Sequence, residues 1–284
     1  MGTTSDPLDS LIRLSHLLGR EPRLVQPGGG NTSIKVGEEL LVKGSGTDLR
    51  TIGREGFTRL SLERLAPLAR ADRMSDAEMM RFMAGCMVGE GPAPSVETPL
   101  HSLLPHRVVA HTHDVATMSL TNISDARAEG LVEELFEGEI VYVPYVRPGF
   151  PLARSVSGMV GNIPANAIGL TLAHHGLVIW GDDAEQCHAR LLRAVGRIDK
   201  YVETCRRGRL LMGAATRAVP TAEERLRLAE LVLPAVRGAL GPSERVILNF
   251  DDGDDVLEAL AGERAPELVA RGMATPEHLL RAGR

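Results

Sequence analysis

Cysteine is scarce in this chain of 284 residues: Cys86, Cys187 and Cys205 are the only three, and no CxxC pair occurs. A disulfide framework and a thiolate-bound metal both require more cysteines at closer spacing, so neither is expected. Residues 1–20 contain early aspartates and no unbroken apolar stretch, which predicts no signal peptide. No later stretch predicts a membrane span. Together these features favour a cytoplasmic protein.

Aromatic residues and excess positive charge are also scarce. Phe, Trp and Tyr make up 3% of the chain while hydrophobic residues of all kinds make up 43%, so aliphatic side chains must build the core. The formal net charge is -5, and no polybasic stretch occurs. We therefore expect neither a nucleic-acid partner nor a membrane partner. The chain also lacks a Walker A loop and a GxGxxG motif, so a nucleotide site is not expected.

Hydrophobic periodicity and turn residues predict a mixed set of helices and strands. Strands are predicted over 31–36, 40–46, 107–113, 139–146, 168–180 with a break at Gly176, and 245–250. Helices are predicted over 8–18, from a capping box at 75–78, from 95, over 182–206, from a cap at 221–224 and from a start at 275–277. No regular βαβ rhythm is present, so the pattern favours an α/β sandwich around a largely antiparallel or mixed sheet. A domain boundary is predicted near Val219-Pro220.

Two histidines lie one residue apart in one predicted strand. Successive side chains of a strand alternate between its faces, so His111 and His113 point to the same side and can converge on one ion. A third histidine comes from the pair His174 and His175 before Gly176, of which only one faces the site, and the pattern does not say which. Three imidazoles with an open position are typical of a catalytic zinc. The alternative is a set of core histidines held by hydrogen bonds.

Glu97 follows Ser95 at a predicted helix start, shortly before the histidine pair. A helix N-terminus offers free backbone N–H groups and a positive dipole end, which suit a phosphate. A carboxylate beside a metal can move a proton at carbon. Helix capping alone is the simpler explanation of both residues. His101, four residues after Glu97, shares its face and is expected to support the site or pack there rather than to bind the ion.

Two glycine-rich segments, 28–33 and 44–47, lie at the two ends of the predicted hairpin. Glycine frees the backbone to present N–H groups to an anion, and the Asn, Ser and Thr of these segments add donors. Lys43 adds a positive charge. Ordinary turn chemistry explains either segment alone. Two such loops meeting beside a metal would form an anion site.

Several segments, in this order and at approximate spacing, resemble the class II aldolase/adducin family: GGGNTSIK, LLVKGSGTDL, PSVETPLH, VVAHTHDV and LAHHGLVIWGD. The likeness is greatest to the rhamnulose-1-phosphate aldolase half of bifunctional aldolase/short-chain dehydrogenase proteins. It continues through VPYVRPGF, ILNFDD and RGMATPEHLLR, so it spans nearly the whole chain. The resemblance implies one three-layer α/β/α domain over 1–284, with a core over about 1–215 and a C-terminal extension over about 216–284. It also implies a homotetramer with active sites at subunit interfaces.

The resemblance implies a role for each candidate residue: zinc ligands His111, His113 and His175, catalytic acid/base Glu97, and phosphate-binding residues Asn31, Ser45, Gly46 and Ser95. The implied reaction is cleavage of a ketose 1-phosphate such as rhamnulose 1-phosphate to dihydroxyacetone phosphate and an aldehyde, with Zn²⁺ or another divalent metal as cofactor. Epimerases, decarboxylases and dehydratases of sugar phosphates use the same metal site and are the alternative. A non-catalytic adducin-like module would not need three convergent imidazoles.

Three positions depart from the family pattern. Val96 stands where phosphate-binding relatives often carry a second serine, and Lys43 or Arg147 is expected to compensate. Asp114 stands where a proline usually follows the two histidines, so the surroundings of these ligands are expected to differ. His174 stands where asparagine is common.

Overall fold

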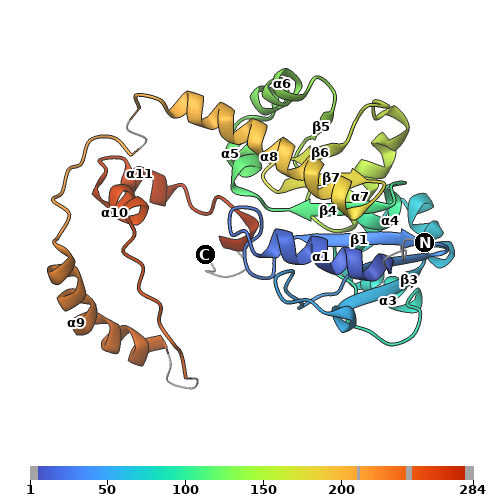
Figure 1. Cartoon of the computed structure of the whole chain (residues 1–284), viewed down its shortest axis with the longest axis horizontal. Helices are drawn as coiled ribbons and strands as arrows, with labels where there is room; N and C mark the ends of the chain where they lie inside the picture. Colours follow the sequence, from blue (N-terminus) through green and yellow to red (C-terminus); the bar gives the residue numbers. More distant parts are fainter. Residues whose placement is uncertain (1–5, 210–211, 241–244, 279–284) are drawn as a thin grey trace, which may run out of the picture. The chain divides into compact units, whose positions relative to one another are not determined.

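The structure is a computed structural model of the chain and describes residues 6–209, 212–240 and 245–278 (Figure 1). The chain folds into two compact units. The first contains the residues up to Thr204 together with the segment that begins at Met273, and the second is Cys205–Gly272. The chain therefore leaves the first unit, forms the second, and then returns to the first.

The first unit is built on a seven-stranded sheet with the strand order β3-β2-β1-β4-β7-β6-β5. The strands are β1 (Asn31–Val36), β2 (Glu39–Lys43), β3 (Phe57–Ser61), β4 (Val108–Thr112), β5 (Ile140–Val143), β6 (Gly169–Leu172) and β7 (Gly176–Gly181). Neighbouring strands are antiparallel, except that β5 and β6 are parallel. The prediction of a largely antiparallel or mixed sheet is therefore confirmed.

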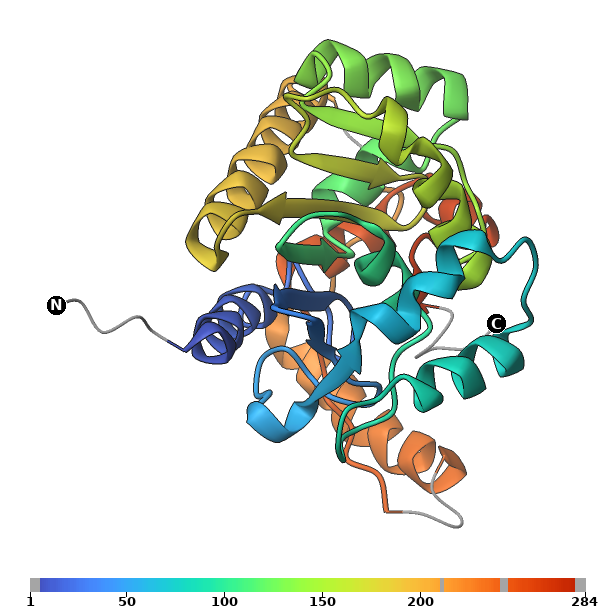
Figure 2. The same cartoon turned by 90° about the vertical axis from the view of Figure 1, so that its right-hand side faces the viewer.

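Helices cover both faces of this sheet, as Figure 2 shows. One face packs against α1 (Pro7–Gly19), α5 (Val115–Thr121), α6 (Asp125–Phe136) and α8 (Ala184–Arg206). The other packs against α2 (Leu62–Leu65), α3 (Asp76–Gly85), α4 (Thr98–Leu103) and α7 (Phe150–Met159). Short 3-10 turns are formed by Arg54–Gly56, Ala66–Arg70 and Val160–Asn162. The predicted three-layer α/β/α arrangement is therefore confirmed.

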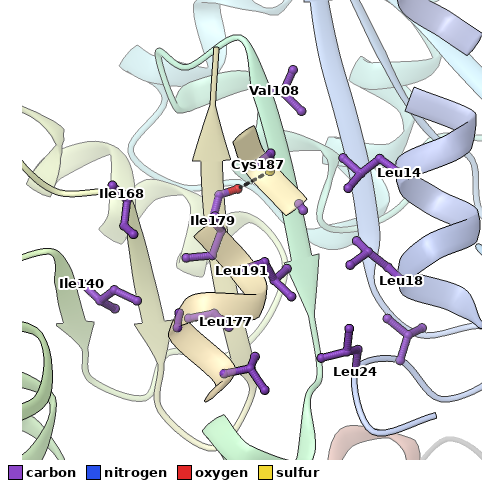
Figure 3. Close-up of a cluster of buried hydrophobic side chains, with 14 of the residues drawn as sticks. Leu14, Leu18, Leu24, Val108, Ile140, Ile168, Leu177, Ile179, Cys187 and Leu191 are labelled. Atoms are coloured by element: carbon purple, nitrogen blue, oxygen red, sulfur yellow. Dashed lines mark hydrogen bonds between the residues drawn. The ribbon is translucent and has the colours of Figure 1, made fainter. Parts of the chain in front are cut away.

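The alternation of side chains along the central strands explains the two helical layers. In β4, Val108 and Ala110 belong to the core under α1 and α8, whereas Val109 belongs to the core under α4 and α7. Figure 3 shows the first of these cores, in which Leu14 of α1 and Leu191 of α8 are fully buried. Each fully buried leucine stabilises the fold by about 1.5–3 kcal/mol relative to an exposed one.

Most predicted elements are present, but one strand is not. The predicted helix 8–18 is α1, and the predicted capping box at Ser75 opens α3, with reciprocal hydrogen bonds to Glu78. The β-rich run 245–250 forms no strand, and Ile247 is 96% exposed. The described residues of the second unit, to which this run belongs, form no strand with which it could pair, so a high β-propensity alone does not make it a strand.

The second unit is helical. It contains α9 (Ala222–Leu240), α10 (Asp254–Ala261) and α11 (Ala265–Ala270). Thr221 and Glu224 form the predicted capping box at the start of α9. Among the helices of the described residues, none is both long enough and apolar enough to cross a membrane.

Candidate metal centre

Strand β4 carries the first candidate ligand, His111, and the second, His113, directly follows the end of that strand. His111 and His113 lie on its α4 side, as the period of two predicted, and both are buried. His111 is flanked by Asn31 of β1 and Val178 of β7 in the sheet register. His111 is therefore held at the centre of the sheet, where neighbouring strands fix its backbone on both sides, and His113 follows two residues later.

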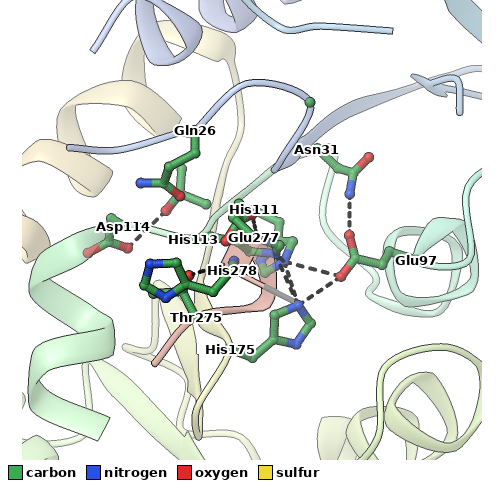
Figure 4. A network of polar contacts seen from close by, with 12 residues as sticks. Gln26, Asn31, Glu97, His111, His113, Asp114, His175, Thr275, Glu277 and His278 are labelled. Carbon is green, nitrogen blue, oxygen red and sulfur yellow. Dashed lines mark hydrogen bonds and ion pairs between the residues drawn. The ribbon is translucent and has the colours of Figure 1, made fainter. Parts of the chain in front are cut away.

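The third ligand is His175, which lies in a turn and not in a strand. Ala173, His174 and His175 connect β6 to β7. A Cβ on Gly176 would lie 2.1 Å from the Thr112 carbonyl oxygen, so only glycine lets this turn approach the end of β4. His175 then points to His111 and His113 (Figure 4).

His174 is directed elsewhere. It adopts a left-handed backbone conformation with φ of 55°, and its Nδ1 lies 3.1 Å from the Asn122 side-chain oxygen. Its ring lies edge-on to that of Tyr145. The turn therefore settles the alternative that the strand pattern left open, because it brings only His175 to the cluster.

The Nε2 atoms of the three histidines converge. They lie 3.0 Å apart for His111 and His113, 3.1 Å for His113 and His175, and 3.3 Å for His111 and His175. An ion bound tetrahedrally at 2.0–2.1 Å from each nitrogen separates the nitrogens by about 3.3–3.4 Å. The spacing is therefore close to that of a zinc site.

The hydrogen bonds behind the rings support this fit. His111 Nδ1 lies 3.0 Å from the Leu177 carbonyl oxygen, which can only accept, so Nδ1 carries a proton. His113 Nδ1 likewise faces the carboxylate of Glu277. In the neutral form both rings then direct Nε2 lone pairs at each other, which a cation between them relieves. The donor set fits a divalent ion, and it is the one such cluster among the described residues.

Glu97, the N-cap residue just before α4, completes the cluster. Its Oε1 lies 2.9 Å from His175 Nε2 and 3.4 Å from His111 Nε2. Burial raises the pKa of Glu97, but the charges and hydrogen bonds of His111 and His175 outweigh burial and hold the pKa well below its usual value. The group is therefore a carboxylate, able to accept a proton.

His111 and His175 differ in the direction in which their pKa values are shifted. Burial lowers the pKa of His111, but Glu97 and the Leu177 carbonyl together raise it by a larger amount. The pKa of His111 therefore lies above its ordinary value. Burial lowers the pKa of His175 to about 4. A positive charge is thus favoured beside Glu97, while His175 stays neutral near pH 7 and keeps a lone pair for a metal.

Two candidate phosphate residues contact Glu97 directly. Asn31 Nδ2 donates to the Glu97 carboxylate, and Ser95 Oγ accepts from the Glu97 backbone N–H at 3.2 Å. Ser95 therefore does not cap α4, whose N-cap is Glu97. Its hydroxyl restrains the Glu97 backbone instead, and Asn31 restrains the carboxylate. His101 has its Nδ1 2.8 Å from Ser33 Oγ and does not belong to the metal cluster.

The other two phosphate candidates lie in an adjacent exposed loop. Gly44 bridges to Pro94, and the Ser45 N–H donates to the Ala93 carbonyl at 2.7 Å, so the loop with Ser45 and Gly46 runs beside Ser95. Gly46 has φ of +78°, which favours glycine. These contacts bring the loop that carries Ser45 and Gly46 next to the segment that leads to Ser95 and Glu97.

Of the two cations expected to compensate for Val96, only Lys43 lies here. It is buried, with Nζ 3.5 Å from the Gly28 carbonyl oxygen. Burial lowers the pKa of Lys43, while the charges of Glu97 and Asp48 oppose that shift. Arg147 pairs with Asp76, the first residue of α3, and is exposed.

Sequence reasoning missed Glu277. This residue belongs to the segment that returns to the first unit, and its carboxylate receives a hydrogen bond from His113 Nδ1. The two residues are 164 positions apart, and the sequence signal at Glu277 was only a predicted helix start. Asp114, by contrast, has a structural role: it is fully buried and accepts from the Thr117 backbone N–H at 2.8 Å, capping α5.

Two curated proteins are similar to this chain. The uncharacterized oxidoreductase YuxG of Bacillus subtilis (strain 168) is 33% identical over 288 residues, which cover 98% of this chain and 41% of that protein. A methylthioribulose-1-phosphate dehydratase of Acidiphilium cryptum (strain JF-5) is 28% identical over 136 residues, which cover 42% of this chain and 64% of that protein. The chain thus spans less than two thirds of the length of either relative.

Solved structures and family models extend the comparison. The N-terminal class II aldolase domain of a conserved protein from Thermoplasma acidophilum is 33% identical, with a TM-score of 0.65, over 71% of this chain and 96% of that one. The model of the class II aldolase second domain matches residues 227–284. The model of the class II aldolase and adducin N-terminal domain matches residues 9–195, more than half of the chain. The chain therefore belongs to the class II aldolase and adducin family.

Proposed function

We propose that this chain is a metal-dependent aldolase that cleaves a ketose 1-phosphate to dihydroxyacetone phosphate and an aldehyde. The observation that carries the proposal is the convergence of three histidine Nε2 atoms beside the Glu97 carboxylate. A divalent ion, proposed to be zinc, would be held by His111, His113 and His175 and would polarise oxygen atoms of the substrate. The proposed setting is a cytoplasmic homotetramer.

Glu97 is the proposed proton carrier. In cleavage the bond between C3 and C4 breaks, the C4 hydroxyl loses its proton as the aldehyde forms, and C3 gains a proton as dihydroxyacetone phosphate forms. Glu97 is ionised, lies beside the cluster, and is held by Asn31 and Ser95, so it can carry a proton to or from carbon. The neighbouring Lys43, Ser45 and Gly46 are proposed to hold the phosphate.

The proposed cleavage and the role of Glu97 can be tested together with a panel of substrates and one variant. Purified protein is supplied with a panel of ketose 1-phosphates, and dihydroxyacetone phosphate is measured enzymatically with and without a chelator. Glu97→Gln should keep the metal and the fold but lower kcat by about 10²–10⁴. Glu90→Gln, at an exposed position, is the matched control and should leave kcat unchanged. Full activity of Glu97→Gln would show that Glu97 is not the proton carrier.

A second experiment tests whether the loop with Ser45 and Gly46 binds the phosphate group of the substrate. Ser45→Ala should raise KM about tenfold for a phosphorylated ketose, because a hydrogen bond to a charged acceptor contributes about 1.5 kcal/mol or more. The free sugar is the internal control, and its KM should stay unchanged. Equal turnover of both sugars, without inhibition by inorganic phosphate, would mean that the site takes a substrate without phosphate.

Dehydration of a ketose 1-phosphate is the second candidate, favoured by the similarity to a methylthioribulose-1-phosphate dehydratase. Both reactions need a metal-polarised carbonyl group and a proton carrier. The same panel separates them, because dehydration retains all carbon atoms in one product and yields no dihydroxyacetone phosphate. Mass spectrometry of the products distinguishes loss of water from cleavage.

A further inference from the structure

The segment that returns to the first unit, Met273–His278, contacts two parts of the candidate metal centre. The Asn122 side chain donates to the Ala274 carbonyl at 2.6 Å, and the same side chain lies 3.1 Å from His174. His174 belongs to the turn that carries His175. Three residues after Ala274, Glu277 contacts His113. The returning segment therefore touches the surroundings of two of the three proposed ligands.

Glu277 is buried for a charged residue, with 8% of its surface exposed. A buried carboxylate is costly unless it is paired. The glycine-rich loop makes room for it, because a Cβ at Gly29 would lie 2.5 Å from Glu277 Oε1. The partner it reaches is His113 Nδ1. The loop predicted to hold an anion thus also accommodates a carboxylate of the chain itself.

The contact determines which nitrogen of His113 faces the cluster. The carboxylate fixes the proton on Nδ1 and leaves the Nε2 lone pair directed at His111 and His175. A carboxylate behind a ligating imidazole also makes that nitrogen a stronger donor to a cation. His111 is oriented by the uncharged Leu177 carbonyl, and His175 Nδ1 has no partner among the described residues. Glu277 is therefore the charged group that orients a ligand from behind.

We propose that Glu277 is a positioning residue of the metal centre, and that metal binding is coupled to docking of Met273–His278 onto the first unit. The inference rests on the metal centre of the proposed function. By linkage, a metal that binds more tightly to the docked state must also stabilise docking, by the same factor. The chain after the second unit thus contributes to the chemistry of a site whose ligands all precede that unit.

The test measures metal affinity in the full-length chain. Metal-free protein is titrated with Zn²⁺ in competition with a chelating dye. Glu277→Ala should weaken binding by about 10–100-fold, the usual effect of removing a group behind a ligand. Glu277→Gln should weaken it less, because the amide oxygen still accepts the Nδ1 proton. Glu258→Gln, at an exposed position of α10, is the matched control and should bind as the wild type does.

A second measurement follows the segment itself. Hydrogen exchange of a peptide covering Met273–His278 should slow when Zn²⁺ is added to the wild type, and should respond less in Glu277→Ala. Asn122→Ala, which removes the contact to Ala274 without altering a ligand, should speed exchange of the same peptide and weaken metal binding by a smaller factor. Melting of each metal-free variant reports whether the fold is retained.

The outcomes separate the two proposals. A wild type that binds Zn²⁺, with unchanged affinity in both Glu277 variants and no protection of the segment, would overturn the coupling and leave the proposed function intact. A wild type that binds no divalent metal would overturn both. A loss in Glu277→Ala that Glu277→Gln partly restores, while the metal-free proteins melt alike, would support the positioning role over a general structural one.

Discussion

The two units of this chain form helices by the same local rules but differ in what those helices bury. Both α3 and α9 begin with a capping box, at Ser75 and Thr221 respectively. In the first unit, apolar helix and strand faces close around extended cores. In the described part of the second, Ala229 and Ala261 are the only buried hydrophobic side chains. Local signals are thus sufficient for a helix, whereas a core also needs a partner surface.

The proposed functional residues also differ between the two units. All nine histidines of the chain lie outside Cys205–Gly272. Every proposed ligand and the proposed acid/base therefore belong to the first unit, where a sheet with packed helices on both faces holds them. A rigid scaffold suits a centre that must keep three ring nitrogens close together.

The largest expected effect concerns the metal. His175→Ala should reduce the bound metal from about one ion per chain to well below one, whereas His174→Ala should retain it. Added metal should stabilise the first unit of the wild type by about 4 kcal/mol at a thousand times its Kd and leave the second unchanged. Metal analysis and calorimetric melting measure both. If His175→Ala retained the metal and His174→Ala lost it, His174 and not His175 would be the third ligand.

A pair of leucine substitutions tests the difference in cores. Leu14→Ala, at a position 1% exposed in α1, should destabilise the first unit by about 2–5 kcal/mol. Leu231→Ala, at a position 74% exposed in α9, should change stability by less than about 0.5 kcal/mol. Urea unfolding provides both values. A comparable loss at Leu231 would break the contrast and show that this apolar side chain is covered in solution.

The most gradual effect, spread over several pH units, is a pH dependence of the first unit. Burial lowers the pKa of His101 to about 3, whereas a histidine in the unfolded chain titrates near 6.5. Between these values the unfolded state binds the extra proton, so stability falls as the pH drops below 6.5. The slope from His101 is at most about 1.4 kcal/mol per pH unit. His101→Asn should flatten the stability profile between pH 6.5 and 4, and an unchanged profile would contradict the assignment.

The sequence predicted much of the site because a strand has a fixed period. That period places His111 and His113 on one face without knowledge of the rest of the fold. It could not distinguish His174 from His175, since the two lie in a turn whose direction depends on how closely Gly176 approaches Thr112. The predicted strand 245–250 failed for a related reason, because strand formation depends on a neighbour that the local sequence does not specify.

Glu277 shows a different limit. Its contact with His113 spans 164 residues and follows an entire second unit, so no local pattern connects the two. The four candidate phosphate residues were implied by the family resemblance, and turn residues and a predicted helix start indicated only that their segments could bind an anion. That Asn31 and Ser95 also restrain Glu97 could be found only from the sheet register and the bend before α4.

The separation of His113 from Glu277 also has a consequence for synthesis of the chain. A ribosome adding about 5–20 residues per second makes His113 roughly 8 to 33 seconds before Glu277, which lies 164 positions later. During that interval the central sheet can form and the three histidines can meet, but the carboxylate behind His113 does not yet exist. The proposed metal should therefore bind weakly to the nascent chain and tightly only after Glu277 has been made, so tight metal binding is expected to be a late step in maturation.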